Sequence, residues 1–353
     1  MKPPSIKDIA HALGISIGTV DRALHGRSDI SLATRARVLK KAEELGYQPN
    51  IAARSLKLNR RLRIGVYFPR EIASFFDALR SGVRAAAAAS TGINVELVFR
   101  TFPRLDEGDL EVLKADTKEK LDGILITPGN PDRIGPALNE VAQRGTPVVC
   151  VASDAPRTQR IASVTADAHT SGAIAAELFS RSIYKPGQLA TFAGELTTLD
   201  HAEKLRGFAA NLAVFAPHLS LLPAMESHEK PSVAYRQATG LLSRKPYPMG
   251  IYVSTANSIP ILRALEKKHL LGEIQVITTD LFPELLPYIE SGKVLATLYQ
   301  RPFAQGKTAL ELLLRYLVQG MAPETTTRLA PHIILRSNLS LFTGYLQERE
   351  DEN

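Results

Sequence analysis

Short apolar runs alternate with amphipathic stretches along most of the chain, from residue 63 to about residue 320. Each run has the length of a buried strand, and each stretch between runs has the apolar period of a helix that covers a sheet. The expected strands are residues 64–68, 95–99, 123–127, 148–152, 189–193, 250–254, 274–279 and 294–299. The expected helices are residues 75–89, 131–144, 171–182, 202–215, 258–269 and 304–320. This alternation predicts parallel β-sheets with helices on both faces.

The first 60 residues have a different pattern, which predicts three short helices. Apolar residues at helical spacing follow Ser5 and end at Gly14, and a second set follows Ser16, a residue type that caps helix N-termini. A third amphipathic segment runs from residue 31 or 32 to about residue 45. Two short helices joined by a tight turn form a helix-turn-helix, which the third helix can cover.

Positive charge is confined to this N-terminal part. The chain has a formal net charge of +7, and residues 1–63 carry 13 Lys and Arg against 5 Asp and Glu. The remaining residues carry 30 basic and 31 acidic side chains, so they are nearly neutral. A basic unit on a neutral body is typical of a protein that docks on a polyanion, because neutralised phosphates release counterions. The alternative is a solvated basic face without a partner.

Composition limits the class of protein. With 44% hydrophobic and 22% charged residues, the chain can bury a large core, and its 353 residues suggest two or three folded units. No apolar run approaches the ~20 residues that cross a bilayer, and the N-terminus lacks the apolar segment of an export signal. We therefore expect a cytoplasmic, nucleoid-associated protein without membrane contact. The single cysteine, Cys150, cannot form an internal disulfide, and we expect neither a metal nor a cofactor.

Enzyme motifs give little support to a catalytic function. The chain contains neither Gly-x-Gly-x-x-Gly nor His-Glu-x-x-His. Gly14-Ile15-Ser16-Ile17-Gly18 matches the Gly-x-Ser-x-Gly elbow of hydrolases, but that elbow needs a strand before the serine. Here a helix precedes Ser16, so we interpret Ser16 as a helix cap and expect no enzyme.

Residues 6–56 resemble a specific family of DNA-binding proteins. The resemblance rests on Ile6-Lys7-Asp8-Ile9-Ala10, Gly14-Ile15-Ser16, Thr19-Val20, Arg22-Ala23-Leu24, Thr34-Arg35, Val38-Leu39, Glu44-Leu45-Gly46-Tyr47, Pro49-Asn50 and Ala53-Arg54-Ser55-Leu56. This pattern is similar to the DNA-binding headpiece and hinge of the lactose/galactose repressor family. It implies an all-α helix-turn-helix headpiece over residues 1–48, followed by a hinge helix and linker over residues 49–62.

The resemblance also implies which residues contact DNA. It places Ile17, Gly18 and Arg22 at base edges in the major groove. The residues that it places on phosphates are Ser16, Thr19 and Asn50. The hinge helix, which includes Ala53, would enter the minor groove, where Leu56 would unstack the central base step as an apolar wedge. A homodimer would insert two such wedges into a palindromic operator.

Three residues depart from the family pattern. Asp21 stands where a serine is usual, and His25 replaces a common asparagine. Gly18 offers no side chain to a base, which leaves Ile17 with thymine-methyl or shape contacts. The operator sequence of a relative therefore cannot be transferred to this chain.

Residues 63–340 resemble the periplasmic sugar-binding-protein fold that serves as the effector domain in the same family, closest to its ribose-binding branch. The resemblance implies an α/β two-subdomain, periplasmic-binding-protein-like (type I) domain with the ligand in the cleft. Its N-subdomain would comprise about 63–165 and 299–325, and its C-subdomain about 166–298 and 326–340. Three crossovers would lie near Ala166, Tyr299 and Thr326. The acidic tail, residues 341–353, lacks apolar heptads, so we expect no tetramerising coiled coil.

The same resemblance proposes effector-binding residues at strand ends. Asp280 and Gln300 match the binding positions of the family best. Lys204 matches an arginine that grips ligand hydroxyls. Phe75 and Phe76 match an aromatic pair that stacks on a sugar ring, and we expect at most one of them to touch the ligand.

Two further candidates match less well. Asp154 lies one or two positions after the Asp-Arg pair of the ribose-binding branch. Asn257 follows an expected strand, and its alternative role is that of a helix cap.

The sequence therefore predicts a sequence-specific transcription regulator, and we expect a repressor of carbohydrate-related genes. Its effector would be a small hydroxylated molecule, for which a monosaccharide is our first choice because carboxylate, amide and aromatic groups suit a polyol. A nucleobase or another non-sugar metabolite is an alternative effector. The alternatives of another class are a transport or chemoreception binding protein without a DNA role, and a carbohydrate enzyme with paired carboxylates.

Overall fold

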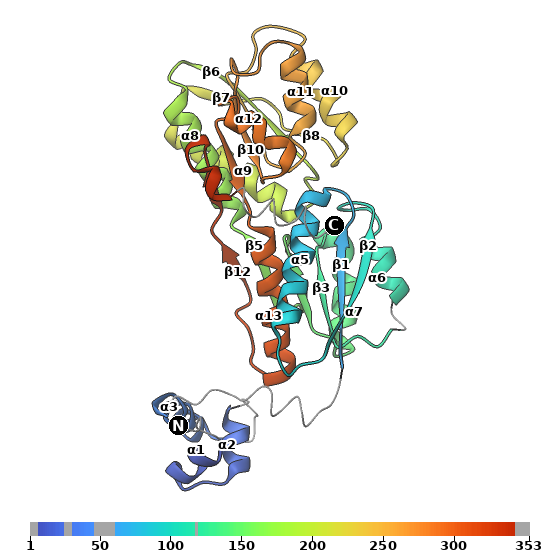
Figure 1. Ribbon diagram of the computed structural model, residues 1–353, viewed down its shortest axis with the longest axis vertical. Coiled ribbons are helices and arrows are strands. Elements are labelled where there is room, and N and C mark those ends of the chain that lie inside the picture. The colour runs from blue at the N-terminus through green and yellow to red at the C-terminus, as the bar shows by residue number, and fades with distance from the viewer. Residues whose placement is uncertain (1–5, 25–29, 46–60, 117–118, 343–353) are drawn as a thin grey trace.

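The computed structural model of the protein describes residues 6–24, 30–45, 61–116 and 119–342 (Figure 1). The expected hinge helix, with Asn50, Ala53 and Leu56, lies outside these residues. His25 and most of the acidic tail lie outside them as well.

Three short helices form the N-terminal unit, as the sequence pattern predicts. They are α1 (Ile6–Leu13), α2 (Ile17–Leu24) and α3 (Leu32–Glu44). Their shared core contains Ile9, Ala10, Val20, Ala23, Val38 and Ala42. Gly14 adopts a left-handed φ of 64° in the turn between α1 and α2, a conformation that glycine tolerates without strain.

The remaining elements form two α/β subdomains, which are stacked along the long axis in Figure 1. The first sheet is wholly parallel, with the strand order β12-β5-β4-β3-β1-β2. Its strands are β1 (Leu62–Pro69), β2 (Val95–Phe102), β3 (Gly123–Ile126), β4 (Val148–Val151), β5 (Ala162–Ala166) and β12 (Thr327–Leu329). Its helices are α5 (Ala73–Ala89), α6 (Asp109–Ala115), α7 (Pro131–Gln143) and α13 (Pro302–Gln319).

The second sheet has the order β13-β11-β10-β9-β6-β7, with β8 also paired to β6 and with β13 antiparallel to β11. Its strands are β6 (Gly187–Ala193), β7 (Leu219–Leu221), β8 (Met225–Glu226), β9 (Gly250–Val253), β10 (Gln275–Thr279), β11 (Ala296–Tyr299) and β13 (His332–Ile334). Its α-helices are α8 (Ala168–Ser182), α9 (Leu199–Phe215), α10 (Pro231–Leu241), α11 (Ile259–Lys267) and α12 (Leu286–Glu290). The 3-10 turns η2 (Pro283–Leu285) and η3 (Arg336–Asn338) complete it.

Each sheet is buried on both faces. In the first subdomain one apolar cluster lies under α5 and α13, and another lies under α6 and α7. In the second, α10 and α11 cover one cluster, while α8 and α9 cover the other. The predicted architecture of parallel sheets between helical layers is therefore confirmed.

The chain passes three times between the two sheets. The first passage follows Ala166 and the second follows Tyr299. The third lies between Leu329 and His332, because β12 pairs with β5 in the first sheet before β13 joins the second. This third passage lies a few residues after the boundary expected near Thr326, so residues 326–329 belong to the N-subdomain. Within the described residues, no helix is both long and apolar enough to cross a membrane.

Two glycines bring the backbones of α8 and α9 into direct contact. A Cβ added to Gly172 would lie 2.0 Å from the Lys204 carbonyl oxygen, and one added to Gly207 would lie 2.1 Å from the His169 carbonyl oxygen. Both helices must therefore keep glycine at this crossing, which fixes Lys204 relative to the first crossover.

We expect Gly172→Ala to lower the free energy of unfolding by about 2–3 kcal/mol, because the methyl group would push α8 away from α9. The matched control is Gly240→Ala, near the end of α10, where an added Cβ has open space around it. That control should be neutral or stabilising by up to about 1 kcal/mol. Urea unfolding of both variants measures the difference, and equal stabilities would contradict the close helix crossing.

Candidate functional site

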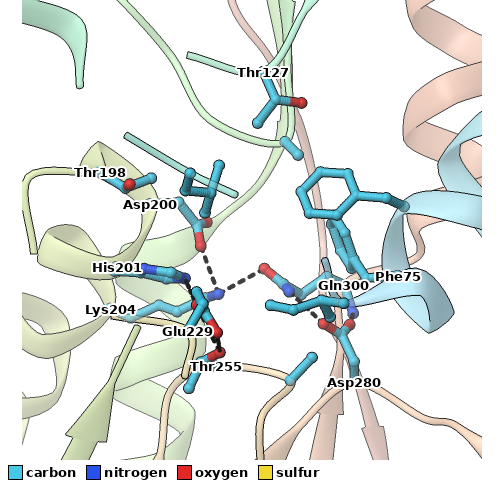
Figure 2. A pocket seen from close by; sticks show the side chains of 15 residues that line it. Phe75, Thr127, Thr198, Asp200, His201, Lys204, Glu229, Thr255, Asp280 and Gln300 are labelled. Atoms are coloured by element: carbon cyan, nitrogen blue, oxygen red, sulfur yellow. Dashed lines mark hydrogen bonds and ion pairs between the residues drawn. The ribbon is translucent and has the colours of Figure 1, made fainter. Parts of the chain in front are cut away.

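A cavity lies between the two subdomains, at the carboxyl ends of strands from both sheets (Figure 2). In parallel α/β sheets this is where ligands bind. The residues that line it are Ile72, Phe75, Phe76, Leu105, Thr127, Ala152, Thr198, Asp200, His201, Lys204, Glu229, Thr255, Ala256, Asp280 and Gln300. Five of the seven effector-binding residues proposed from the sequence are among them.

Lys204 is the centre of a chain of polar contacts in this cavity. Its side chain is 1% exposed, and its Nζ donates to Asp200 Oδ2 at 2.6 Å and to Gln300 Oε1 at 2.7 Å. The amide of Gln300 continues the chain, because Nε2 donates to Asp280 Oδ2 at 2.6 Å. Figure 2 shows this sequence of contacts running from α9 to the loops after β10 and β11.

Local structure explains how these groups meet. Asp200 and Lys204 are four residues apart at the start of α9, so they lie on the same face of the helix. Asp280 and Gln300 each follow one of the neighbouring parallel strands β10 and β11. Asp280 has a left-handed φ of 66°, and its Oδ1 accepts the backbone N–H of Gln300 at 3.0 Å. This contact holds the carboxylate over the end of the sheet.

Glu229 is a second buried carboxylate, and it is held by a hydroxyl and an imidazole. Thr255 Oγ1 donates to it at 2.8 Å, and His201 Nε2 lies 3.5 Å from Glu229 Oε1. His201 Nδ1 lies 2.9 Å from the backbone nitrogen and 3.1 Å from the backbone oxygen of Glu195, so the Glu195 backbone holds the ring with Nε2 facing Glu229. A Cβ on Gly194 would lie 1.7 Å from Glu229 Oε1, so only glycine fits beside this pair.

Burial shifts the protonation of these groups. Desolvation raises the pKa of Glu229 to about 7 and that of Asp280 to about 6. It lowers the pKa of His201 to about 4, with a further contribution from the positive charge of Lys204. The imidazole is therefore neutral near pH 7.

One wall of the cavity is apolar and aromatic. Phe75 and Phe76, at the start of α5, both line it, with their rings edge to face and their centroids 5.0 Å apart. Two polar atoms around the cavity have no hydrogen-bond partner among the described residues: Asp200 Oδ1 and Thr127 Oγ1. Both are buried, so a bound molecule that supplies hydrogen bonds would satisfy them.

Asp154 and Asn257 do not line this cavity, so the structure does not support their proposed roles. Asp154 pairs with Arg160, at 2.6 Å between its Oδ2 and the guanidinium, and it accepts the Ser163 hydroxyl at 3.0 Å. At the strand end Ala152 takes the cavity position, with a left-handed φ of 66°. Asn257 follows Thr255 and Ala256, which take the places in the lining.

Several lining residues were not predicted from the sequence. Glu229 and Thr255 follow strands at positions without a motif, and His201 is one residue from Asp200, which could have been a helix cap only. The available signal was the position of Thr255 after the apolar run of β9, which is weak because such positions also cap helices and form turns.

The helix-turn-helix exposes the residues that were predicted to read DNA. Ser16 caps α2, since its Oγ accepts the Thr19 backbone N–H at 3.0 Å. Ile17 is 50% exposed at the first position of α2, and Gly18 is exposed beside it. Arg22 lies one turn further along α2 and is half-buried.

Comparison with known proteins assigns both parts of the chain. Residues 5–50 match the family described as bacterial regulatory proteins, lacI family, and residues 64–320 match a periplasmic binding protein domain. The chain belongs to the lacI family. Members of this family bind DNA and regulate transcription, so the exposed face of α2 belongs to a DNA-binding domain and the cavity to a sugar-binding-protein-like effector domain.

Relatives of this lacI-family regulator match it over nearly its whole length. Catabolite control protein A of Priestia megaterium is 25% identical over 343 residues, which cover 94% of this chain and 97% of the relative. An HTH-type transcriptional repressor PurR of Aliivibrio fischeri is 26% identical over 356 residues, covering 95% and 98%. The second relative is a transcriptional repressor, which supports a repressor role.

Solved structures match the effector domain. GanP, a glucose-galactose binding protein of Geobacillus stearothermophilus, has a TM-score of 0.72 and 25% identity, over 79% of this chain and 99% of that one. A Caulobacter myo-inositol binding protein has the same TM-score at 20% identity, over 79% and 95%, which establishes the shared fold.

The raised pKa of Glu229 predicts a pH dependence of stability. The unfolded carboxyl ionises near pH 4.5, whereas the folded one holds its proton to about pH 7. The contribution of this carboxyl group to the free energy of unfolding is therefore fully present below pH 4.5, and it is lost as the pH rises through 7. Between pH 4.5 and pH 8, we expect the free energy of unfolding of Glu229→Gln to rise relative to that of the wild type by about 3 kcal/mol.

Chemical unfolding at several pH values measures this difference. Glu273→Gln, which changes an exposed glutamate, is the matched control and should follow the wild type at each pH. A Glu229→Gln curve parallel to the wild type would contradict the buried, protonated carboxyl.

Proposed function

We propose that this lacI-family protein is a homodimeric repressor whose effector is a neutral, hydroxylated molecule of monosaccharide size. The observation that carries the proposal is the chain of contacts through Lys204, Gln300 and Asp280. It offers an ammonium, an amide and a carboxylate side by side, and these groups recognise vicinal hydroxyls as donors and as acceptors.

The charges around the cavity oppose an anionic effector. Among the residues that the structure describes, Lys204 is the one Lys or Arg in the lining, and Asp200 already pairs with it. Glu229 and Asp280 add two further carboxyls. A phosphorylated sugar or a carboxylate would therefore meet net negative charge in a buried site, which is unfavourable.

The aromatic wall favours a sugar over a nucleobase as the effector. Phe75 and Phe76 both come from α5, so they cover one side of the cavity and suit the apolar C–H face of a sugar. GanP, which is similar to this domain, is a glucose-galactose binding protein. A nucleobase is the second candidate, because the amide and carboxylate of Gln300 and Asp280 also suit the edge of a base.

Effector binding has a physical route to the DNA-binding unit. Thr198, in the C-subdomain, donates to the Gly129 carbonyl of the N-subdomain at 2.7 Å, and Thr197 donates to Asp106 Oδ2 at 3.1 Å. These contacts hold the two subdomains together across the cleft. We propose that an effector stabilises this arrangement and so alters the spacing of the two DNA-binding units on a palindromic operator.

A thermal-shift screen over sugars, polyols and nucleobases tests the effector class. We expect a neutral sugar or polyol to raise the melting temperature, and Asp280→Asn to weaken its binding by about 10- to 100-fold, because a charge-assisted acceptor is lost. Asp132→Asn, at an exposed position in α7, is the matched control and should bind like the wild type.

Two outcomes would contradict the proposal. Stabilisation by nucleobases alone would select the second candidate. Equal sugar binding by the wild type and Asp280→Asn would show that the contacts around Gln300 do not belong to the effector-binding site.

A further inference from the structure

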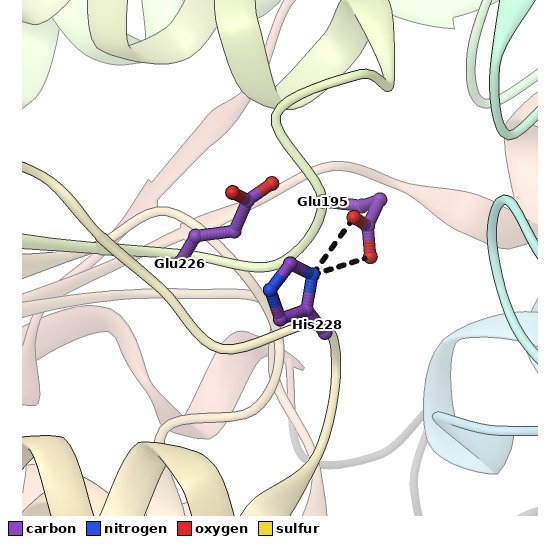
Figure 3. A group of neighbouring side chains, drawn as sticks. All are labelled: Glu195, Glu226 and His228. Carbon is purple, nitrogen blue, oxygen red and sulfur yellow. Dashed lines mark hydrogen bonds and ion pairs between the residues drawn. The ribbon is translucent and has the colours of Figure 1, made fainter.

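We propose that Glu195, Glu226 and His228 form a binding site for a divalent transition-metal ion of the zinc type, beside the effector cavity and separate from its lining. Figure 3 shows the three side chains converging from the loop after β6, from β8 and from the loop after β8. One ligand atom of each residue lies within 4.8 Å of the others.

The donor set suits Zn²⁺. One imidazole nitrogen and two carboxylate oxygens are ligands that zinc binds at about 2.0–2.2 Å, and three protein ligands leave a fourth position for water. In a tetrahedral site the ligand atoms would lie about 3.3 Å apart, so the group must contract slightly. His228 allows this movement, because its side chain is 49% exposed.

In the part of the chain that the structure describes, the two glutamates have no Lys or Arg partner that would compete with a metal. Among residues 6–24, 30–45, 61–116 and 119–342, neither Glu195 nor Glu226 forms an ion pair with Lys or Arg, and His228 Nδ1 is 2.9 Å from Glu195 Oε1. A divalent cation would offset the negative charge of the two carboxylates.

The position of the site predicts that a bound metal ion would affect the structure of two neighbouring loops. The backbone N–H of Leu196 donates to Glu226 Oε1 at 2.6 Å, so the two loops already touch. The first loop carries Thr197 and Thr198, which bond across the cleft, and the second carries Glu229 into the effector cavity. A bound ion would therefore fix the C-subdomain wall of the cleft.

Calorimetric titration of the metal-stripped, full-length protein with Zn²⁺ alone tests the site. We expect His228→Asn and Glu226→Gln each to weaken binding about 10-fold or more, since each removes one of three ligands. Gln keeps the acceptor for Leu196, and Asn tolerates the left-handed φ of 52° at residue 228. Co²⁺ in place of Zn²⁺ should give visible absorption bands that both variants lose.

The matched control is His269→Asn, which also changes an exposed histidine with a left-handed φ, of 56°. It should bind Zn²⁺ like the wild type. Absence of Zn²⁺ binding in the wild type, or an equal loss in His269→Asn and His228→Asn, would overturn the proposal. Melting temperatures without metal verify that each variant is folded. If Glu226→Gln does not fold, Zn²⁺ binding by His228→Asn tests the proposal. None of these outcomes depends on the identity of the effector.

Discussion

The buried ammonium of Lys204 is the constraint around which the effector cavity is organised. A charge that is 1% exposed must be paired and hydrogen-bonded, because removing one partner of a buried ion pair costs about 3–5 kcal/mol. Asp200 and Gln300 meet that need from two different parts of the chain, and Gln300 in turn orients Asp280. The direct contact of α8 and α9 at their glycines fixes the helix that carries Lys204. The polar groups of the cavity are thus held in place by contacts within the protein.

Much of the fold could be predicted because its signals are local. The strands around β1, β3 and β9 are continuous apolar runs, and Ser16 caps α2 as its residue type suggests. Asp280 and Gln300, which line the cavity, could be proposed from the family resemblance because they directly follow such runs. β12 could not, because its sequence Thr-Arg-Leu has no apolar run and its place is decided by pairing with β5. Glu229 follows the two-residue strand β8 in a left-handed conformation, so only tertiary structure brings it to the cavity.

The excess positive charge is confined to residues 1–63, and the α/β domain begins near the end of this segment. One chain can therefore bind DNA through its N-terminal part and a small molecule through its α/β domain. The basic segment of residues 1–63 suits the phosphates of DNA, while the nearly neutral α/β domain supplies a cleft whose walls are joined by Thr197 and Thr198. If the effector and the operator each favour one arrangement of that cleft, their binding is coupled, and the coupling is reciprocal. A metal ion between the loops of Glu195 and Glu226 would act on the same wall and so on the same equilibrium.

We expect occupation of the cavity to change DNA binding. The most direct test is the anisotropy of a labelled operator, selected from random duplexes, that is titrated with the protein in the presence and absence of the stabilising compound. We expect a change in operator Kd of about 5- to 150-fold for the wild type, no change for Asp280→Asn at the same concentration, and weak binding by Arg22→Ala under both conditions. An operator Kd that no cavity-binding compound alters would contradict this coupling.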